Sequence, residues 1–399
     1  MKSNYKRLGD YIREVNIRNT NLEDVKLLGV SIQKVFMPSI ANTIGTNMST
    51  YKIIKKGQFA YGPVTSRNGD KISVALLDGY EKAMISQAYT SFEVIDENQL
   101  LPKYLMMWFR RSEFDRYARF MSHGSAREIF GWDEMCNTTL PVPSITKQIE
   151  IVKEYNVLVN RINLNNSLIQ KLEETSQAIY KQWFIDFEFP NENGLSYKSN
   201  GGEMEFNKEF NKEIPKGWIA GKLNDIAVLV NEKISIEKLT TKNYISTENM
   251  LQNRGGVVEI EKLPDVIKVS KFTVGNILIS NIRPYFKKIW LATFDGGCST
   301  DVLCFKSNRE ILPEFLYYVL ERDAFFDYVM AGSKGTKMPR GDKNWIMEYP
   351  ILLANGNVLD AFNKILIPLN ILKNSMRQEV ALLNSLSTML LSKLATVED

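Results

Sequence analysis

Loops rich in arginine and lysine are the part of this sequence best suited to chemistry, and that chemistry is contact with phosphate. The stretch 110–127 carries five arginines and two carboxylates, and the stretch 333–343 carries four basic residues and one carboxylate. The segment 281–288 adds three basic residues beside two aromatic ones. Basic side chains neutralise phosphates, while Arg, Asn, Ser and Thr can also reach base edges. These loops favour a nucleic-acid partner, with simple solvation of the charges as the alternative for each residue.

Small polar residues stand at matching places in these loops. Ser-His-Gly-Ser (122–125) corresponds to Ser-Lys-Gly-Thr (333–336), and the turn 65–68 is a further candidate in the first half. Glycine and small hydroxyl residues allow close approach to a phosphate, although an ordinary turn explains them equally well. We expect the DNA-binding residues to be Thr65, Ser66, Arg67, Asn68, Lys71, Arg116, Arg119, Ser122, His123, Ser125, Arg127, Asn281, Arg283, Tyr285, Lys287, Lys288, Lys334, Thr336, Lys337, Arg340 and Lys343.

Catalytic and metal-binding patterns are missing from the sequence. His123 is the single histidine, and Cys136, Cys298 and Cys304 have neither disulfide nor metal spacing. We find no phosphate-binding loop, no dinucleotide fingerprint and no Asn-Pro-Pro-Tyr adenine-methylase motif. The net charge of +4 neither requires nor excludes nucleic acid. We therefore expect no catalytic residue, no metal ligand and no cofactor in this chain.

The N-terminal residues and the apolar runs predict a cytoplasmic chain without a membrane segment. The first twenty residues are polar and charged, unlike a signal peptide. No apolar run approaches the roughly 18 residues that a bilayer span requires.

The sequence repeats itself, which determines how the basic loops are positioned. Leu8-Gly9-Asp10 recurs as Leu223-Asn224-Asp225 at an offset of 215, and Leu101-Pro102 as Leu312-Pro313 at 211. Phe114, Tyr117 and Gly124 match Phe325, Tyr328 and Gly335, also at 211. The matches keep their order while the offset drifts slowly, so we interpret them as an internal repeat.

Each half follows the same plan of elements. Short stretches that alternate apolar and small residues, such as 72–76 and 289–293, predict strands, with glycines marking the turns. A helix is expected at each Leu-Pro, with proline at its first position. Each half then ends in a long helical run, so the expected fold class is α+β.

The two terminal runs carry heptad patterns. Positions 362, 365, 369, 372, 376, 379, 383, 386, 390 and 393 alternate three and four apart, and eight of the ten are apolar. The positions 210 lower include seven apolar residues. Such a seam predicts a coiled coil, while a long amphipathic helix lying on its own domain is the alternative. Pro368 marks either a kink or the true helix start. The expected helix-pair interface contains Val159, Ile162, Ile169, Tyr180, Leu372, Met376, Leu383 and Leu390.

These patterns predict two recognition domains separated by two long antiparallel helices, related by a pseudo-two-fold axis. Such symmetry suits duplex DNA, because two different heads would read two half-sites, one per strand, separated by a fixed gap. The expected segments are a first target-recognition domain at 1–144, a first long helix at 145–189, a connector at 190–218, a second domain at 219–352 and a second long helix at 353–399.

A family resemblance rests mainly on the connector. It reads FIDFEFPNENG at 184–194, YKSNGG at 197–202 and IPKGW at 214–218. The first half adds LGDY at 8–11 and LPVPS at 140–144, with a glutamine at 148. Together these stretches resemble the specificity subunit of type I restriction–modification systems across nearly the whole chain. The second half departs from the pattern at 354–357, where Ala-Asn-Gly-Asn stands without a matching glutamine, and this leaves the start of that helix open.

The resemblance implies a function and a set of partners. It implies a non-catalytic subunit that binds double-stranded DNA at a bipartite, asymmetric site. It also implies two modification subunits that carry S-adenosylmethionine and methylate adenine, and restriction subunits that use ATP and Mg. Two other hypotheses stay open. They are a coiled-coil adaptor without sequence-specific DNA binding, and an enzyme with an unrecognised active site.

Overall fold

The chain forms two compact units in the computed structural model, which describes residues 5–39, 45–66, 68–69, 71–124, 127–308, 311 and 313–398. Unit 1 comprises Met1–Asn166 and Gln378–Asp399, and unit 2 comprises Ser167–Arg377. Within the described part of the chain, no helix has the length and apolar character needed to cross a membrane.

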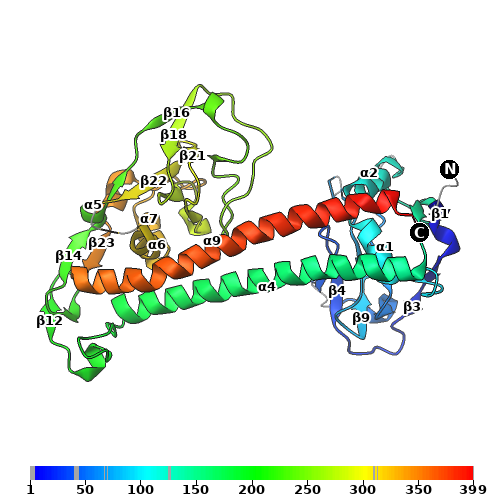
Figure 1. Cartoon of the computed structure of the whole chain (residues 1–399), viewed down its shortest axis with the longest axis horizontal. Coiled ribbons are helices and arrows are strands. Elements are labelled where there is room, and N and C mark those ends of the chain that lie inside the picture. Colours follow the sequence, from blue (N-terminus) through cyan, green and yellow to red (C-terminus); the bar gives the residue numbers. More distant parts are fainter. Residues whose placement is uncertain are drawn as a thin grey trace. The chain divides into compact units, whose positions relative to one another are not determined.

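Unit 1 contains two sheets, a strand pair and three short helices (Figure 1). The first sheet has the order β2-β10-β7-β8 and the second β3-β6-β9-β4-β5; β1 pairs with β11. Of these pairings only β4 with β9 is parallel in the described residues. The bounds are β1 Tyr5–Arg7, η1 Leu8–Asp10, β2 Ile12–Val15, β3 Ile17–Arg18, β4 Leu27–Val30, β5 Phe36–Pro38, η2 Met48–Thr50, β6 Lys52–Lys55, β7 Phe59–Tyr61, β8 Val74–Leu76, β9 Lys82–Ile85, β10 Thr90–Val94, α1 Pro102–Phe109, α2 Ser112–Phe120, α3 Trp132–Asn137, β11 Thr139–Pro141 and η6 Leu394–Thr396.

Unit 2 repeats this topology except at the edge strand β5, which has no counterpart among its described strands. Its sheets have the orders β15-β22-β19-β20 and β16-β18-β21-β17, again with one parallel pairing, β17 with β21, and β14 pairs with β23. The bounds are η3 Lys198–Asn200, β12 Met204–Asn207, β13 Lys212–Pro215, β14 Ile219–Lys222, α5 Leu223–Ile226, β15 Ala227–Leu229, β16 Lys233–Ser235, η4 Ile236–Lys238, β17 Tyr244–Ile245, β18 Lys268–Phe272, β19 Ile277–Ser280, η5 Pro284–Phe286, β20 Ile289–Leu291, β21 Gly296–Cys298, β22 Val302–Ser307, α6 Pro313–Leu320, α7 Asp323–Ala331, α8 Lys343–Met347 and β23 Pro350–Leu353. The matching strand orders confirm the predicted internal repeat.

The two Leu-Pro pairs start equivalent helices, as predicted. Helix α1 begins at Pro102 and helix α6 at Pro313. Proline is suited to a first helical position, because the N–H that it lacks would have no intrahelical acceptor there. The predicted connector also contains regular structure, since β12 and β13 form an antiparallel hairpin.

The long helices are α4 (Ile145–Phe184) and α9 (Gly356–Lys393), and they pack together within each unit. In unit 1, Arg161 forms hydrogen bonds of 2.7 and 3.1 Å with the Glu379 carboxylate. In unit 2, Lys373 Nζ donates to Glu173 Oε2 at 2.6 Å, and the Trp183 and Phe362 rings lie 5.7 Å apart. In unit 2 the residue numbers rise along α4 as they fall along α9, so the helices there are antiparallel. The α+β fold with paired long helices is therefore confirmed.

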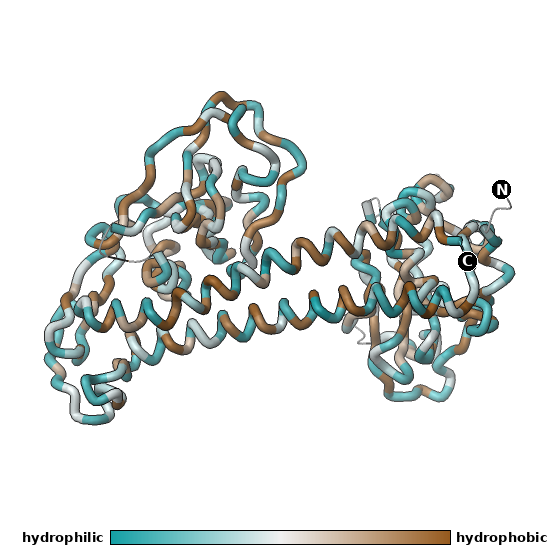
Figure 2. Tube along the Cα trace, in the orientation of Figure 1, coloured by the Kyte–Doolittle hydropathy of each residue, from teal (hydrophilic) through white to brown (hydrophobic). Residues whose placement is uncertain are grey.

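The seam of α9 differs in phase from the predicted one. Leu372, expected at the interface, is 44% exposed, whereas Lys373 beside it is only 4% exposed. Leu366, Ser387 and Leu394 are likewise buried, each one position after the residue the heptad pattern had chosen. Tyr180 is buried, and the other predicted interface residues are half-buried: Val159, Ile162, Ile169, Met376, Leu383 and Leu390. The interpretation of Leu372 was wrong because α9 has exposed apolar residues, such as Ile371 and Leu382, as well as buried ones such as Leu366, so two phases fit the sequence. Figure 2 shows that hydrophobic residues recur along this helix.

The first turns of the two long helices make different side-chain hydrogen bonds. At α4, the buried Gln148 side chain donates to the carbonyls of Gln99 and Pro143 and accepts from the Leu101 N–H at 2.9 Å. At α9, the Asn355 side chain accepts from the Val358 N–H at 3.1 Å. This asparagine cap explains how the second helix begins without a glutamine. Pro368 lies inside α9, so it does not mark the helix start.

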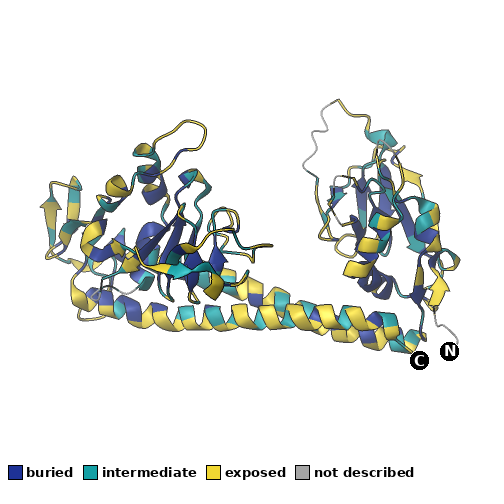
Figure 3. Cartoon of the chain, turned by 90° about the horizontal axis from the view of Figure 1, so that it is seen from above, coloured by how far each residue is buried: buried dark blue, intermediate teal, exposed yellow. Residues whose placement is uncertain are grey.

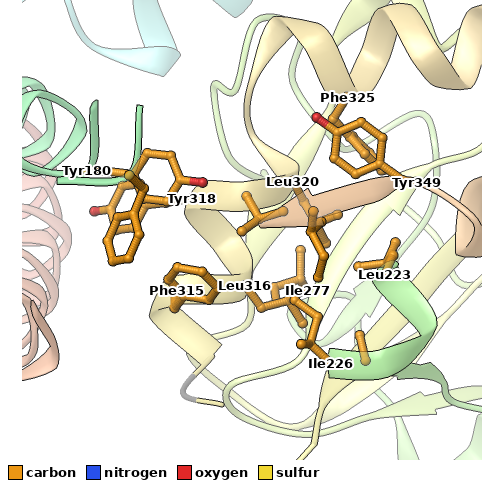
Figure 4. Packing of buried hydrophobic residues seen from close by; sticks show 14 of the residues in the cluster. Tyr180, Leu223, Ile226, Ile277, Phe315, Leu316, Tyr318, Leu320, Phe325 and Tyr349 are labelled. Carbon is orange, nitrogen blue, oxygen red and sulfur yellow. The ribbon is translucent and has the colours of Figure 1, made fainter. Parts of the chain in front are cut away.

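Each unit has its own aromatic core, to which the long helices contribute. Figure 3 shows buried residues concentrated in the sheets and short helices, while the long helices remain largely exposed along their outer faces. In unit 2, Tyr180 of α4 stacks on Tyr318 at 6.0 Å and contacts Phe315, both from α6 (Figure 4). In unit 1, Ile151, Val152 and Tyr155 of α4 join the core. Burial of these side chains fixes each domain on its own stretch of helix.

Candidate nucleic-acid interface

In unit 1, the two predicted DNA-binding loops lie against each other. The loop after β7 and the loop after α2 form an antiparallel bridge between Val64 and Ile129. The Thr65 N–H donates to the Glu128 carbonyl at 3.0 Å, and the Phe130 N–H donates to the Pro63 carbonyl at 2.8 Å. The backbone therefore joins residues 63–65 to residues 128–130 in one site.

Unit 2 builds the equivalent site in the same way. Ile282 and Arg340 form the matching bridge. The Arg283 N–H donates to the Pro339 carbonyl at 2.8 Å, and the Gly341 N–H donates to the Asn281 carbonyl at 3.3 Å. The segments 281–288 and 333–341 are thereby joined as in unit 1.

The second loop of each site is closed by a reciprocal pair of backbone hydrogen bonds. His123 pairs with Ile129 in unit 1, and Lys334 pairs with Arg340 in unit 2. Gly124 and Gly335 follow the first residue of each pair with φ of +132° and +95°. A Cβ on Gly124 would meet the Arg127 carbonyl oxygen at 2.1 Å, so only glycine fits this turn.

Several predicted DNA-binding cations are held by acidic side chains. Arg119 pairs with Glu128, and Arg116 with Glu113 at 3.7 Å. Lys334 pairs with Asp342 at 2.8 Å, and Arg340 pairs with Asp301 at 3.2 Å. Exposed pairs of this kind can exchange partners readily, because each contributes little free energy. Among the described residues, the exposed cations Lys71, Arg127, Lys337 and Lys343 form no ion pair.

Three predicted DNA-binding residues hold the loops together instead. Thr65 is 1% exposed, and its hydroxyl donates to Ser122 Oγ at 2.9 Å. The Ser122 hydroxyl donates to the Ala118 carbonyl at 2.7 Å. Asn281 is 9% exposed, and its amide donates to the Gly341 carbonyl at 3.1 Å. Thr65 and Asn281 are buried and Ser122 is half-buried, and all three already bond to neighbouring loop atoms, so direct DNA contact by these residues stays a prediction.

The remaining predicted residues divide by exposure. Ser66, His123, Tyr285 and Thr336 are exposed. Lys288 is half-buried, its Nζ donates to the Thr247 carbonyl at 2.7 Å, and burial lowers its pKa. Asn68, Arg283 and Lys287 are also half-buried. The predicted residues Arg67 and Ser125 lie outside the described residues.

A third loop of unit 2, which sequence analysis missed, supports this site. The N–H groups of Asn253 and Arg254 donate to the carbonyls of Phe286 and Lys287, both at 2.9 Å. The Arg254 guanidinium and the Lys287 ammonium both bind Asp323 Oδ1, at 2.5 and 2.8 Å, and this lowers the pKa of Asp323 to about 2. The sequence signal was weak, since only the glycines 255 and 256 indicate a turn here.

The described residues contain neither a cluster of metal ligands nor a reactive thiol. Within the described ranges, no group of three or more His, Cys, Asp and Glu residues is arranged to hold a metal ion. The three cysteines are buried, and burial raises the pKa of the Cys298 thiol to about 12, so it carries no nucleophilic thiolate.

Comparisons with known proteins give one consistent relationship. A comparison with profiles of protein families found no match. The chain is 27% identical over 191 residues to the type I restriction enzyme HindI specificity subunit of Haemophilus influenzae, covering 45% of this chain and 40% of that protein. It is 22% identical over 278 residues to the EcoDI specificity subunit of Escherichia coli, covering 66% of this chain and 62% of that protein. The matches thus span less than two thirds of these relatives.

A solved structure shares the fold. The S subunit of a type I restriction–modification system from M. genitalium matches with a TM-score of 0.54 and 13% identity, over 99% of this chain and 96% of that one. At this identity the likeness shows the fold.

Proposed function

Because the chain belongs to the family of type I restriction enzyme specificity subunits, we propose that it is the non-catalytic DNA-recognition subunit of such a complex. It reads a bipartite, asymmetric site on double-stranded DNA, one half-site with each unit. The observation that carries this proposal is the duplicated site. Both units join the same two loops by matched backbone bridges and place basic residues on them.

The exposed members of the paired loops are suited to this task. Arg127 and Lys71 in unit 1, and Lys337 in unit 2, are exposed and free of ion pairs among the described residues. Such cations can neutralise phosphates, while Ser66, Asn68 and Thr336 can reach base edges. The different side chains on equivalent loops would make the two half-sites different in sequence.

Partner subunits supply the chemistry in this proposal. Two modification subunits carry S-adenosylmethionine, and restriction subunits use ATP and Mg, all in the cytoplasm. Large apolar side chains on the outer faces of the long helices, among them Val157, Leu164, Ile371 and Leu382, are exposed and provide a protein-binding surface.

A coiled-coil adaptor is the second candidate, and the same exposed helix faces favour it. Salt dependence separates the two functions. A protein that binds phosphates loses DNA affinity steeply between about 50 and 200 mM salt, because bound cations are released from the DNA. An adaptor whose basic loops serve only solubility would show no measurable DNA binding at either concentration.

The decisive experiment is co-expression with the modification subunit, followed by genome-wide mapping of N6-methyladenine. We expect methylation at a two-part consensus with different halves. Methylation without such a consensus would contradict the proposed function.

A further inference from the structure

Unit 1 contains a cationic pocket apart from the paired-loop bridge. Its volume is about 370 Å³, and its lining includes Lys34 and Lys71. Arg110 and Arg111, which directly precede helix α2, also line it. Two carboxylates, Glu113 and Asp115, also line it. With four basic and two acidic side chains, the pocket has a surplus of positive charge.

The acidic residues are already occupied. Asp115 Oδ1 binds Lys34 Nζ at 2.7 Å and accepts from the Ile72 N–H at 3.1 Å. Glu113 forms ion pairs with Arg116 at 3.7 Å and with Arg111 at 3.6 Å, and it accepts a long hydrogen bond of 3.5 Å from the Ser112 hydroxyl. Lys71 has no ion pair among the described residues. Lys71 and Arg110 are therefore the cations of the pocket that have no carboxylate partner among the described residues.

Arg111 is the buried cation of this pocket. It is 6% exposed, and its guanidinium lies 4.2 Å from the centre of the Trp108 ring. Its Nε has no hydrogen-bond acceptor in the described part of the chain. Its nearest carboxylate, Glu113, lies 3.6 Å from this Nε, so the charge of Arg111 is only partly matched and favours a further anion beside the guanidinium.

The start of α2 presents further donors. This helix has nine residues, and its N-cap, Arg111, makes no side-chain capping hydrogen bond. The first N–H groups of a helix lack intrahelical acceptors and attract anions. The helix start and the buried guanidinium thus line the same pocket.

The internal repeat shows what fills the equivalent place in unit 2. Arg111 and Ser112 correspond to Arg322 and Asp323 at the offset of 211, and Arg322 is likewise the uncapped N-cap of α7. In unit 2 the Asp323 carboxylate gathers Arg254 and Lys287. In unit 1 the corresponding residue is a serine, so the carboxylate that gathers two cations in unit 2 is missing at this position.

We infer that this pocket of unit 1 binds a phosphate group, which takes the place that the Asp323 carboxylate has in unit 2. Phosphate fits because it accepts several charge-assisted hydrogen bonds at once from guanidinium and backbone N–H donors. The group can come from free phosphate or from a DNA backbone. The inference does not require sequence-specific recognition.

The test uses the full-length chain and the substitution S112D, which installs the carboxylate of unit 2. Calorimetric titration with inorganic phosphate should show binding to the wild type and about tenfold or greater weakening in S112D, equivalent to about 1.4 kcal/mol. The variant should also have a higher melting temperature than the wild type in phosphate-free buffer. R111Q should lose binding as well, and K208Q, which removes an exposed lysine between β12 and β13 of unit 2, is the control that keeps it.

A second titration, with a non-specific DNA duplex, shows whether the bound phosphate group is free phosphate or part of a DNA backbone. Saturable binding of inorganic phosphate with unchanged DNA affinity in S112D indicates a free phosphate ligand. Weaker DNA binding by S112D, without binding of inorganic phosphate to the wild type, indicates a backbone phosphate. If S112D changes neither phosphate binding nor DNA affinity, the inference is overturned, whatever the methylation map shows.

Discussion

Glu321 follows helix α6 as a buried acid whose neighbours oppose its ionisation. Burial, together with the nearby Glu173 carboxylate, raises its pKa from 4.5 to about 8. The folded protein therefore holds this proton between about pH 4.5 and 8, where the unfolded chain releases it. Since stability falls with rising pH wherever the folded state binds more protons, unit 2 should lose stability over this window.

The substitution E321Q tests this directly, because a glutamine cannot ionise. We expect the wild type to melt at a lower temperature at pH 9 than at pH 6, at a cost of about 1.4 kcal/mol for each unit of raised pKa. E321Q should lose much of this difference. E314Q, at the start of the same helix, should retain it. An unchanged pH dependence in E321Q would mean that the acid is already ionised at neutral pH.

Gly124 supports a second prediction for a single residue. An alanine there would place its Cβ 2.1 Å from the Arg127 carbonyl oxygen and would have to adopt a φ of +132°, at a cost of about 1–3 kcal/mol. G124A should therefore open the loop and remove hydrogen-exchange protection from the Ile129 N–H, which donates to the His123 carbonyl at 2.9 Å. G79A is the control, since a Cβ on Gly79 meets nothing within 4 Å. Full protection in G124A would refute the tight turn.

For single residues, the sequence predicted which loops form the site but not the role of every residue in them. Residue type alone predicted DNA contact for Arg127 and Lys337, which are exposed cations. It predicted the same for Thr65 and Asn281, which are buried. The difference arises because two loops far apart in sequence pair through their backbones. Small polar residues at such a junction satisfy neighbouring donors and acceptors, and no local pattern shows this.

At the scale of elements, Lys373 of α9 and Glu173 of α4 form an ion pair between the two long helices. Lys373 Nζ donates to Glu173 Oε2 at 2.6 Å and to the Tyr318 hydroxyl at 3.2 Å, so it ties α9 to α4 and α6. K373A would leave the half-buried Glu173 carboxylate without its partner, and we expect a loss of about 3 kcal/mol. The midpoint of urea unfolding measures this loss.

The exposed pair of Arg161 and Glu379 provides the matched comparison. Its side chains are largely solvated, so R161A should hardly shift the unfolding midpoint. The double variant E173Q/K373M should recover part of the stability lost in K373A, because no uncompensated charge then remains. Equal losses for K373A and R161A would show that Lys373 is hydrated in solution.

The long helices also show what a heptad pattern can predict and what it cannot. Their pairing was predictable because apolar residues recur over many turns. The phase was not, because adjacent apolar residues such as Ile365 and Leu366 fit either position. The choice depends on tertiary contacts, among them Lys373 reaching Glu173 and Tyr318, and a polar residue at a seam position cannot be read from hydrophobicity.

For the whole molecule, the repeat was the most useful signal in the sequence. Weak identities such as Phe114 with Phe325 correspond to matching places in two units whose strand orders agree apart from the edge strand β5. Strand pairing within each unit was harder to predict from the sequence, because short strands are stabilised by partners far along the chain. The duplicated topology makes the recognition of two half-sites by two separate units the natural hypothesis.

Independence of the two units gives the prediction that tests this hypothesis. Arg127 lies on the exposed loop of unit 1 and Lys337 on the corresponding loop of unit 2. R127Q should relax or weaken recognition of one half of the methylated consensus, and K337Q should affect only the other half. K208Q, which removes an exposed cation between β12 and β13, should leave both halves intact. The measurement is the N6-methyladenine map of each variant co-expressed with the modification subunit. If either substitution blurred both halves equally, the two loops would act on one shared sequence, because a contact confined to one unit can change only the bases which that unit reads.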